Sequence, residues 1–455
     1  AVADAVAATA AIAVAVVEAA ASPVGPRPAV AKPMSDALYT PLDPVVHTLD
    51  NGLRVVCEYL PYVHSASIGV WIKTGSVNET PEQAGISHFL EHLLFKGTES
   101  RTARELMEAV EGRGGKLNAF TTREDTCLYA KTLDQHAGSA FDVLADIINH
   151  STFCDLDKER NVILEEIASN QDVPDDYVHD LLTEFAWPGH ALGRPIAGYE
   201  STVSATGLNE VRTFRDRWYT PENMIVSIVG RFDEAVFLKQ VEDAFGGLDR
   251  DTEPLSIDAP GYQAGQRIER RDIAQDHLLW CFPGVSVTHP NRVAYDMLST
   301  VLGGGSTSRL FERIREQEGL AYAVYSFHST HAMTGMLGIY AAVAPENLQH
   351  TLDISGEELR KLCDERIPEV ELLSNREQLK GGLLLALENT FARMSRMVRS
   401  LIYRDRIVHV PEILELLDGV TADDVQRVAQ QTFSDEGSAL AVLGPAEADA
   451  FRLRV

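Results

Sequence analysis

The order of the predicted helices and strands recurs on the two sides of a polar break that begins just past residue 250. The break, residues 251–265, is rich in the turn-forming residues that mark domain boundaries. The chain is therefore predicted to be α+β, with a unit of about 200 residues duplicated into two homologous α/β sandwich domains related by internal pseudo-symmetry. Two unrelated α+β domains are the alternative, because the evidence is element order rather than sequence identity.

Local patterns give the individual elements. Asn51-Gly52 is a strong turn signal and predicts a hairpin. The apolar run 66–73 predicts a strand that is buried on both faces. Periodicity predicts further first-half elements: helices at 86–95 and 102–111 and strands at 117–121 and 126–132. Past the break it predicts a strand at 277–282, helices at 292–302 and 308–316, and strands at 321–328 and 334–342.

We therefore divide the chain into an Ala/Pro-rich extension at 1–33, a first domain at 34–250 and a second at 251–455. The extension lacks the early basic residues of a signal or transit peptide, since the first is Arg27. We expect it to be an added tail, with Met34 as an alternative start and a poor secretion signal as the minority interpretation. The sequence contains no run of 18 apolar residues free of charge, so it predicts no membrane span.

Composition and cysteine usage limit the classes of partner that the chain is expected to bind and the cellular compartment in which it is expected. The 455 residues carry 40 Lys and Arg against 67 Asp and Glu, a net charge of −27, which makes nucleic acid an improbable partner. The five cysteines are scattered and form no C-x-x-C, so a reducing compartment is expected. The bacterial cytoplasm is the first choice, ahead of the mitochondrial matrix or secretion.

The segment His88-Phe89-Leu90-Glu91-His92 is the most specific local motif. His88 and His92 lie one helical turn apart on one face, so that both imidazoles can reach a single ion. Glu91 adjoins them and can act on a metal-bound water, which zinc acidifies to a pKa of about 7. The motif inverts the H-E-x-x-H zinc motif. Chance would produce it in roughly three chains in a hundred of this composition, so a third ligand is required.

A predicted helix beginning at Asp155 or Asp157 offers that third ligand. Glu159 and Glu166 are seven residues apart and share one helical face. One can ligate zinc while the other orients a histidine or the ligand. A solvated acidic face is the alternative interpretation of this helix.

Six segments carry a resemblance to a known family: 84–98, 114–125, 159–167, 192–200, 218–230 and 303–326. Through them the chain resembles the pitrilysin family of inverted-motif zinc peptidases, specifically the branch of mitochondrial processing peptidase and bacterial processing-like peptidases. The resemblance covers about residues 45 to 445.

The resemblance implies one zinc ion per chain, bound by His88, His92 and Glu166, with Glu91 as general base and Glu159 assisting. It also implies that Asn118 and Ala119 belong to an edge strand, to which substrate adds as an extended strand.

In the second half the resemblance implies that Arg315 and Tyr322 hold substrate and assist the tetrahedral intermediate, whereas in isolation a structural Arg and a core Tyr would be expected. The glycines of 303–305 stand where the first half has its histidine helix. They offer no metal ligand, and because no G-K-[ST] follows them they make a weak phosphate loop.

The function predicted from these features is zinc endopeptidase activity on unfolded peptides inside a closed chamber. Family members build the chamber from four such domains, so a homodimer is implied, with Arg315 and Tyr322 acting on the partner's zinc site. The first domain has a net charge of −17 and the second −10, which suggests basic peptides as substrates. The alternatives are a non-catalytic scaffold or partner subunit like the bc1 core proteins, and zinc-dependent binding without turnover.

Overall fold

The computed structural model describes residues 44–249, 257–447 and 452–455. The predicted extension at 1–33, the candidate start at Met34 and the predicted boundary at residues 250 and 251 lie outside the described residues. The boundary therefore stays a prediction.

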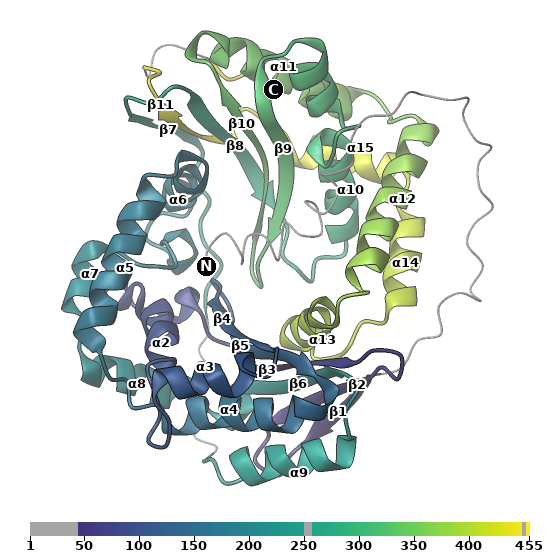
Figure 1. The fold of residues 1–455 in the computed structure, drawn as a ribbon. Helices are drawn as coiled ribbons and strands as arrows, with labels where there is room; N and C mark the ends of the chain where they lie inside the picture. Colours follow the sequence, from purple (N-terminus) through teal and green to yellow (C-terminus); the bar gives the residue numbers. More distant parts are fainter. Residues whose placement is uncertain (1–43, 250–256, 448–451) are drawn as a thin grey trace.

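The first half forms a six-stranded sheet in the order β1-β2-β6-β3-β5-β4 (Figure 1). Its strands are β1 (Val45–Thr48), β2 (Arg54–Tyr59), β3 (Ser65–Ile72), β4 (Lys116–Thr121), β5 (Thr126–Leu133) and β6 (Met224–Gly230). β1 pairs antiparallel with β2 through the Asn51-Gly52 turn, and Gly52 takes a φ of 91°, so the predicted hairpin is confirmed. β2 runs parallel to β6, and the other neighbours are antiparallel.

The second half repeats this topology in a five-stranded sheet, in the order β7-β11-β8-β10-β9. Its strands are β7 (Gly265–Arg270), β8 (Asp276–Gly284), β9 (Ala321–Thr330), β10 (Gly335–Val343) and β11 (Ala439–Gly444). β7 is parallel to β11, as β2 is to β6, and the following pairs are antiparallel in both sheets. The duplicated architecture is therefore confirmed by topology, independently of sequence identity.

The helices, like the strands, follow the same order along the chain in both halves. The first half has α2 (Ile86–Leu94), α3 (Ala103–Glu111), α4 (Ala137–His150), α5 (Leu156–Gln171), α6 (Pro174–Ala186), α7 (Glu200–Ala205), α8 (Leu208–Trp218) and α9 (Glu234–Phe245). The second half has α10 (Arg292–Gly303), a π-helix at Phe311–Gln317, α11 (Leu348–Asp364), α12 (Glu369–Ala386), α13 (Thr390–Arg404), α14 (Val410–Gly419) and α15 (Ala422–Thr432). α2 thus corresponds to α10, α5 to α12, and α6 to α13.

Each sheet packs one face against helices of its own half and the other face against a helix of the other half. α13, from the second half, covers the first sheet (Figure 1). Met394, Met397 and Val398 of α13 are fully buried there, in one cluster with Trp71. Conversely, α6 from the first half packs Val178, Leu181 and Leu182 against Leu279, Cys281 and Tyr340 of the second sheet. The two halves therefore complete each other's cores.

This exchange explains the burial of β3, Trp71 and Trp187, whereas Trp280 packs in the core of its own half. The strand predicted at 66–73 is β3, which is almost entirely buried because α13 covers the face that its own helices leave open. Trp71, Trp187 and Trp280, expected as core aromatics, are 0%, 2% and 0% exposed.

None of the described helices combines the length and the apolar character that crossing a bilayer requires.

Candidate active site

The helix that carries the H-x-x-E-H motif, α2, begins at a tightly built turn. Gly85 precedes it with a φ of 93°, and a Cβ at that position would lie 2.5 Å from the carbonyl oxygen of Ala197. The buried carboxylate of Glu79 accepts hydrogen bonds from the backbone N–H groups of Gly85 and Ser87, both at 2.8 Å. These bonds satisfy donors that the first helical turn leaves unpaired and fix the position of the turn that contains His88.

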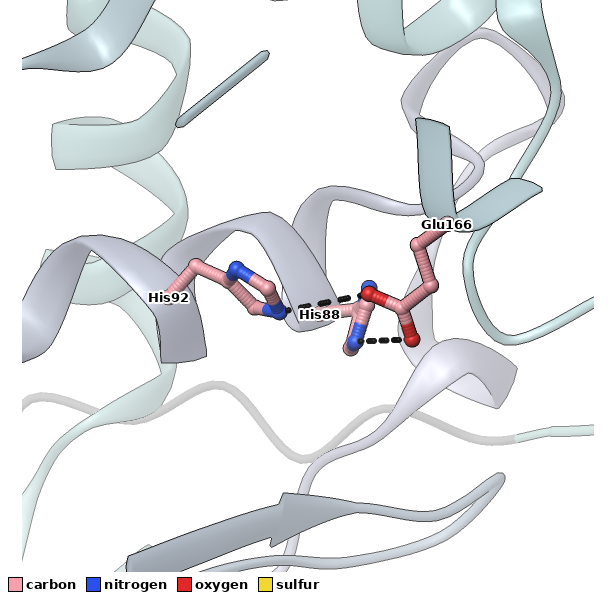
Figure 2. Close-up of side chains that lie close together, drawn as sticks. All are labelled: His88, His92 and Glu166. Carbon is pink, nitrogen blue, oxygen red and sulfur yellow. Dashed lines mark ion pairs between the residues drawn. The ribbon is translucent and has the colours of Figure 1, made fainter. Parts of the chain in front are cut away.

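His88, His92 and Glu166 converge at one point between α2 and α5 (Figure 2). The Nε2 atoms of His88 and His92 each lie 3.6 Å from an oxygen of Glu166, and one ligand atom from each residue falls within 4.8 Å of the others. Within the part of the chain that the structure describes, this is the one group of three His, Cys, Asp or Glu side chains that meets this spacing. The structure thus brings Glu166, rather than Glu159, to the pair of imidazoles.

The chemistry of the three residues fits zinc. Two imidazole nitrogens and one carboxylate are the ligand types that catalytic zinc sites use, leaving a fourth position for water. His88 is 2% exposed, and neither of its ring nitrogens has a hydrogen-bond partner among the described residues. Burial, with a smaller contribution from His92, lowers the pKa of His88 to about 3. The imidazole is therefore neutral at physiological pH, which is the form that binds a metal.

Glu159 lies behind His92. Its Oε2 is 3.4 Å from His92 Nδ1, the ring nitrogen on the side away from Glu166. Its side chain is 3% exposed. This is the arrangement in which a carboxylate orients a ligating imidazole, so the structure places Glu159 where the assisting role implied by the family resemblance requires it.

Glu91 is 6% exposed and points at the edge strand β4, where the hydroxyl of Thr121 donates a 2.6 Å hydrogen bond to its Oε2. Burial raises the pKa of Glu91 to about 7, against the lowering effect of the Thr121 hydrogen bond, and nearby Glu166 adds to the increase. A carboxylate with this pKa can both accept and release a proton near neutral pH. Sequence reasoning missed Thr121, although it shares a strand face with Ala119 two residues earlier.

Asn118 and Ala119 lie on β4, at the edge of the first sheet, as expected. They pair with Tyr129 and Leu128 of β5. The backbone N–H of Ala119 donates to the side-chain Oδ1 of Asn118 at 3.0 Å. An extended peptide added at this edge can therefore compete for that donor.

Arg315 and Tyr322 lie together, and no contact joins them to His88, His92 or Glu166. The guanidinium of Arg315 stacks 4.6 Å from the centre of the Tyr322 ring and donates to the Tyr322 carbonyl oxygen at 3.1 Å. Tyr322 is 80% exposed, so the expectation of a core tyrosine, drawn from this residue in isolation, is wrong. Both residues belong to the second half: Arg315 lies in the π-helix at 311–317 and Tyr322 on β9.

The glycine run of the second half has a packing explanation. α10, the counterpart of α2, ends at Gly303, where a Cβ would lie 2.4 Å from the backbone nitrogen of Ser326 on β9. Gln378 of α12, the counterpart of α5, donates to the carbonyl oxygen of Gly304 at 2.9 Å. The glycines allow close packing in the region where the first half holds His88, His92 and Glu166.

Comparison with known sequences gives matches along most of the chain. The sequence model of insulinase (peptidase family M16) matches residues 54–200, and that of the peptidase M16 inactive domain matches residues 207–379. An uncharacterized zinc protease of Bacillus subtilis, YmxG, is 41% identical over 401 residues, covering 88% of this chain and 98% of the relative. An uncharacterized zinc protease of Streptomyces coelicolor is 40% identical over 408 residues, covering 88% and 89%.

Solved structures share the fold at low sequence identity. A protease from Helicobacter pylori superposes with a TM-score of 0.82 at 24% identity, over 89% of this chain and 99% of that one. A chain of complex III2 from Candida albicans superposes with a TM-score of 0.78 at 19% identity, over 89% and 96%. One fold therefore serves a protease and a respiratory complex, so the assignment of an activity depends on the residues of the site.

Proposed function

Because the chain belongs to the insulinase family of peptidases (family M16), we propose that it is a zinc metalloendopeptidase that hydrolyses unfolded peptides. The observation that carries the proposal is the convergence of His88, His92 and Glu166, with Glu91 beside them on the same helix. The curated relatives described above are named zinc proteases, which supports zinc as the metal.

The side chains have complementary tasks in peptide hydrolysis. When bound, zinc supplies a water of lowered pKa and polarises the scissile carbonyl group. Glu91 removes the proton of the attacking water and delivers it to the leaving amine nitrogen. Thr121 holds one oxygen of the Glu91 carboxylate at 2.6 Å, which leaves the other oxygen available for the water. Glu159 holds the His92 ring.

An extended substrate would pair with β4. This strand has an open edge in the sheet order, and it carries both the Ala119 N–H and the Thr121 hydroxyl that contacts Glu91. Main-chain pairing along β4 would therefore align a scissile bond with the general base. Such pairing requires an extended backbone, which is why we propose unfolded peptides rather than folded proteins as substrates.

We propose that two chains enclose the substrate in a chamber and that Arg315 and Tyr322 serve the zinc site of the partner. The support is that Tyr322 is 80% exposed, that Arg315 is partly exposed, and that neither contacts His88, His92 or Glu166 of its own chain. The test mixes inactive Glu91→Gln with inactive Tyr322→Phe, since heterodimers would contain one intact composite site. Heterodimers that form without regaining activity would refute the trans arrangement.

The charge on α6 supports a preference for basic peptides. This helix directly follows α5, which carries Glu166, and it bears Asp175, Asp176, Asp180 and Glu184. Negative charge near the cleavage site attracts cationic peptides, most strongly at low salt. Cleavage rates that did not depend on peptide charge at low salt would contradict this preference.

The scaffold alternative deserves its own test because the fold is shared with a chain of complex III2. Zinc content and cleavage of quenched peptides should be measured on the same preparation of wild-type protein. The proposal expects one zinc per chain and cleavage that a chelator and Glu91→Gln each abolish. A fully zinc-loaded protein that cleaves nothing across a broad peptide library would favour scaffolding or binding without turnover.

A further inference from the structure

Lys96 lies just beyond the end of α2, one helical turn after His92. Its ammonium is 2.8 Å from Oε1 of Glu159, the carboxylate whose other oxygen lies 3.4 Å from His92 Nδ1. Lys96, Glu159 and His92 therefore form a continuous series that ends at the group expected to bind the metal. The contact pairs a half-buried cation, 28% exposed, with a carboxylate that is 3% exposed.

The surroundings of Lys96 fix where its side chain starts. Its backbone N–H donates to the carbonyl oxygen of Leu93 at 3.1 Å, and its own carbonyl oxygen accepts from the Cys154 thiol at 2.9 Å. The first contact ties Lys96 to the end of α2, and the second ties it to the segment that leads into α5. The ammonium is thus held between the helix of His88 and His92 and the helix of Glu159 and Glu166.

Lys96 supplies a partner for the second carboxylate oxygen of the buried Glu159. A carboxylate as buried as this one is costly unless both oxygens have partners, and an imidazole N–H satisfies only one of them. The ammonium of Lys96 occupies the second oxygen and so favours a single orientation of the carboxylate. A fixed carboxylate in turn holds the His92 ring with its Nε2 directed at Glu166.

We propose that Lys96 is a positioning residue for the metal site, which sets the zinc affinity of the chain by fixing Glu159 and, through it, His92. The inference rests on the proposed function only in requiring that His88, His92 and Glu166 bind zinc. It differs from a purely structural tie between α2 and α5, which would stabilise the fold without changing metal affinity.

The test measures the zinc dissociation constant of the metal-stripped full chain by competition with a chelator. Lys96→Met is expected to raise this constant by about 10- to 100-fold, the usual range for groups that support a metal ligand. Lys96→Arg, which keeps the cation, is expected to restore most of the affinity. Lys158→Met is the matched control, because Lys158 is exposed, adjoins Glu159 in sequence and makes no ion pair among the described residues.

A double-mutant cycle shows whether Lys96 acts through Glu159. In a Glu159→Gln background, Lys96→Met is expected to change the zinc dissociation constant by less than about threefold. Equal zinc affinities for Lys96→Met and Lys158→Met would overturn the inference, as would an undiminished effect of Lys96→Met in that background. A lower melting temperature of metal-free Lys96→Met at unchanged zinc affinity would also overturn it, by showing a structural tie alone.

These readouts are independent of proteolysis. A wild-type chain that binds no zinc would refute both the inference and the proposed function. A chain that binds zinc in a Lys96-dependent way yet cleaves no peptide would refute the proposed function and support the inference.

Discussion

Replacing Met394 with alanine tests whether the helix exchange between the halves holds the first sheet together. Met394 is fully buried on α13. Its Cε lies 3.0 Å from the point where a Cβ on Gly69 would stand, so the methionine fills the space above a glycine of β3. The substitution therefore removes atoms from the contact between a second-half helix and the first-half sheet.

The expected loss in free energy of unfolding depends on how little the residues around Met394 can move into the cavity. Burial of this kind makes Met→Ala cost about 2–5 kcal/mol. We expect about 3–4 kcal/mol, because Gly69 has no side chain to enter the cavity and Trp71 is held by a 3.1 Å hydrogen bond from its Nε1 to Ser227. Met333→Ala is the control: this methionine is 51% exposed, and its loss should cost less than about 0.5 kcal/mol.

The assay is urea unfolding of the metal-stripped chain at a fixed protein concentration, followed by tryptophan fluorescence. A fixed concentration is needed because association would add to the apparent stability. Since α13 and α6 each complete the core of the other half, both halves should unfold in one transition, which Met394→Ala shifts to lower urea. A change in the free energy of unfolding no larger than that of Met333→Ala would refute the packing argument.

Three further predictions concern the helix start, a buried ion pair and a buried histidine. Gly85→Ala should lower zinc affinity at least about 10-fold, because its Cβ would meet the Ala197 carbonyl and shift α2; wild-type affinity in a chelator competition would contradict this. Arg399→Met should cost about 3 kcal/mol in urea unfolding at pH 8, because it leaves the 1% exposed Asp125 without its cation at 3.7 Å; a cost below about 1 kcal/mol would contradict it. Burial lowers the pKa of His179 from 6.5 to about 4, so between these values the unfolded chain binds a proton that the folded chain does not, and stability falls as the pH drops. His179→Asn should remove about 3 kcal/mol of the stability lost between pH 7 and pH 4, and an unchanged pH dependence of urea unfolding would contradict this assignment.

Much of the fold could be predicted because local pattern and burial agree. The helices at 86–95 and 102–111 are α2 and α3, and the helix predicted to begin at Asp155 or Asp157 is α5, which begins at Leu156. The apolar run of β3 correctly indicated burial on both faces. Periodicity reports that a face is buried but not which segment covers it, so the exchange of α6 and α13 could not be predicted. The helix predicted at 308–316 is present mainly as a π-helix, whose wider turns the hydrophobic period does not reveal.

The candidate site, like the fold, contains residues that could be predicted from local sequence pattern and others that could not. His88, Glu91 and His92 could be placed together because they share one helix, and the seven-residue spacing put Glu159 and Glu166 on one face of another. Lys96 and Thr121 were missed because their contacts join separate elements and depend on how α2 packs against α5 and β4. The i+4 spacing from His92 to Lys96 was the one local signal that could have directed attention to the lysine.

The reciprocal covering of the two sheets has a consequence for how such a chain can arise and be divided. Two copies of one unit that trade an equivalent helix form a domain-swapped dimer, and here both copies are joined covalently. The joint makes the swap intramolecular, so that it no longer depends on protein concentration. Neither copy is a self-sufficient folding unit, because each would leave one face of its sheet exposed to water. A cut within 257–264 should therefore give two fragments that fold only with each other.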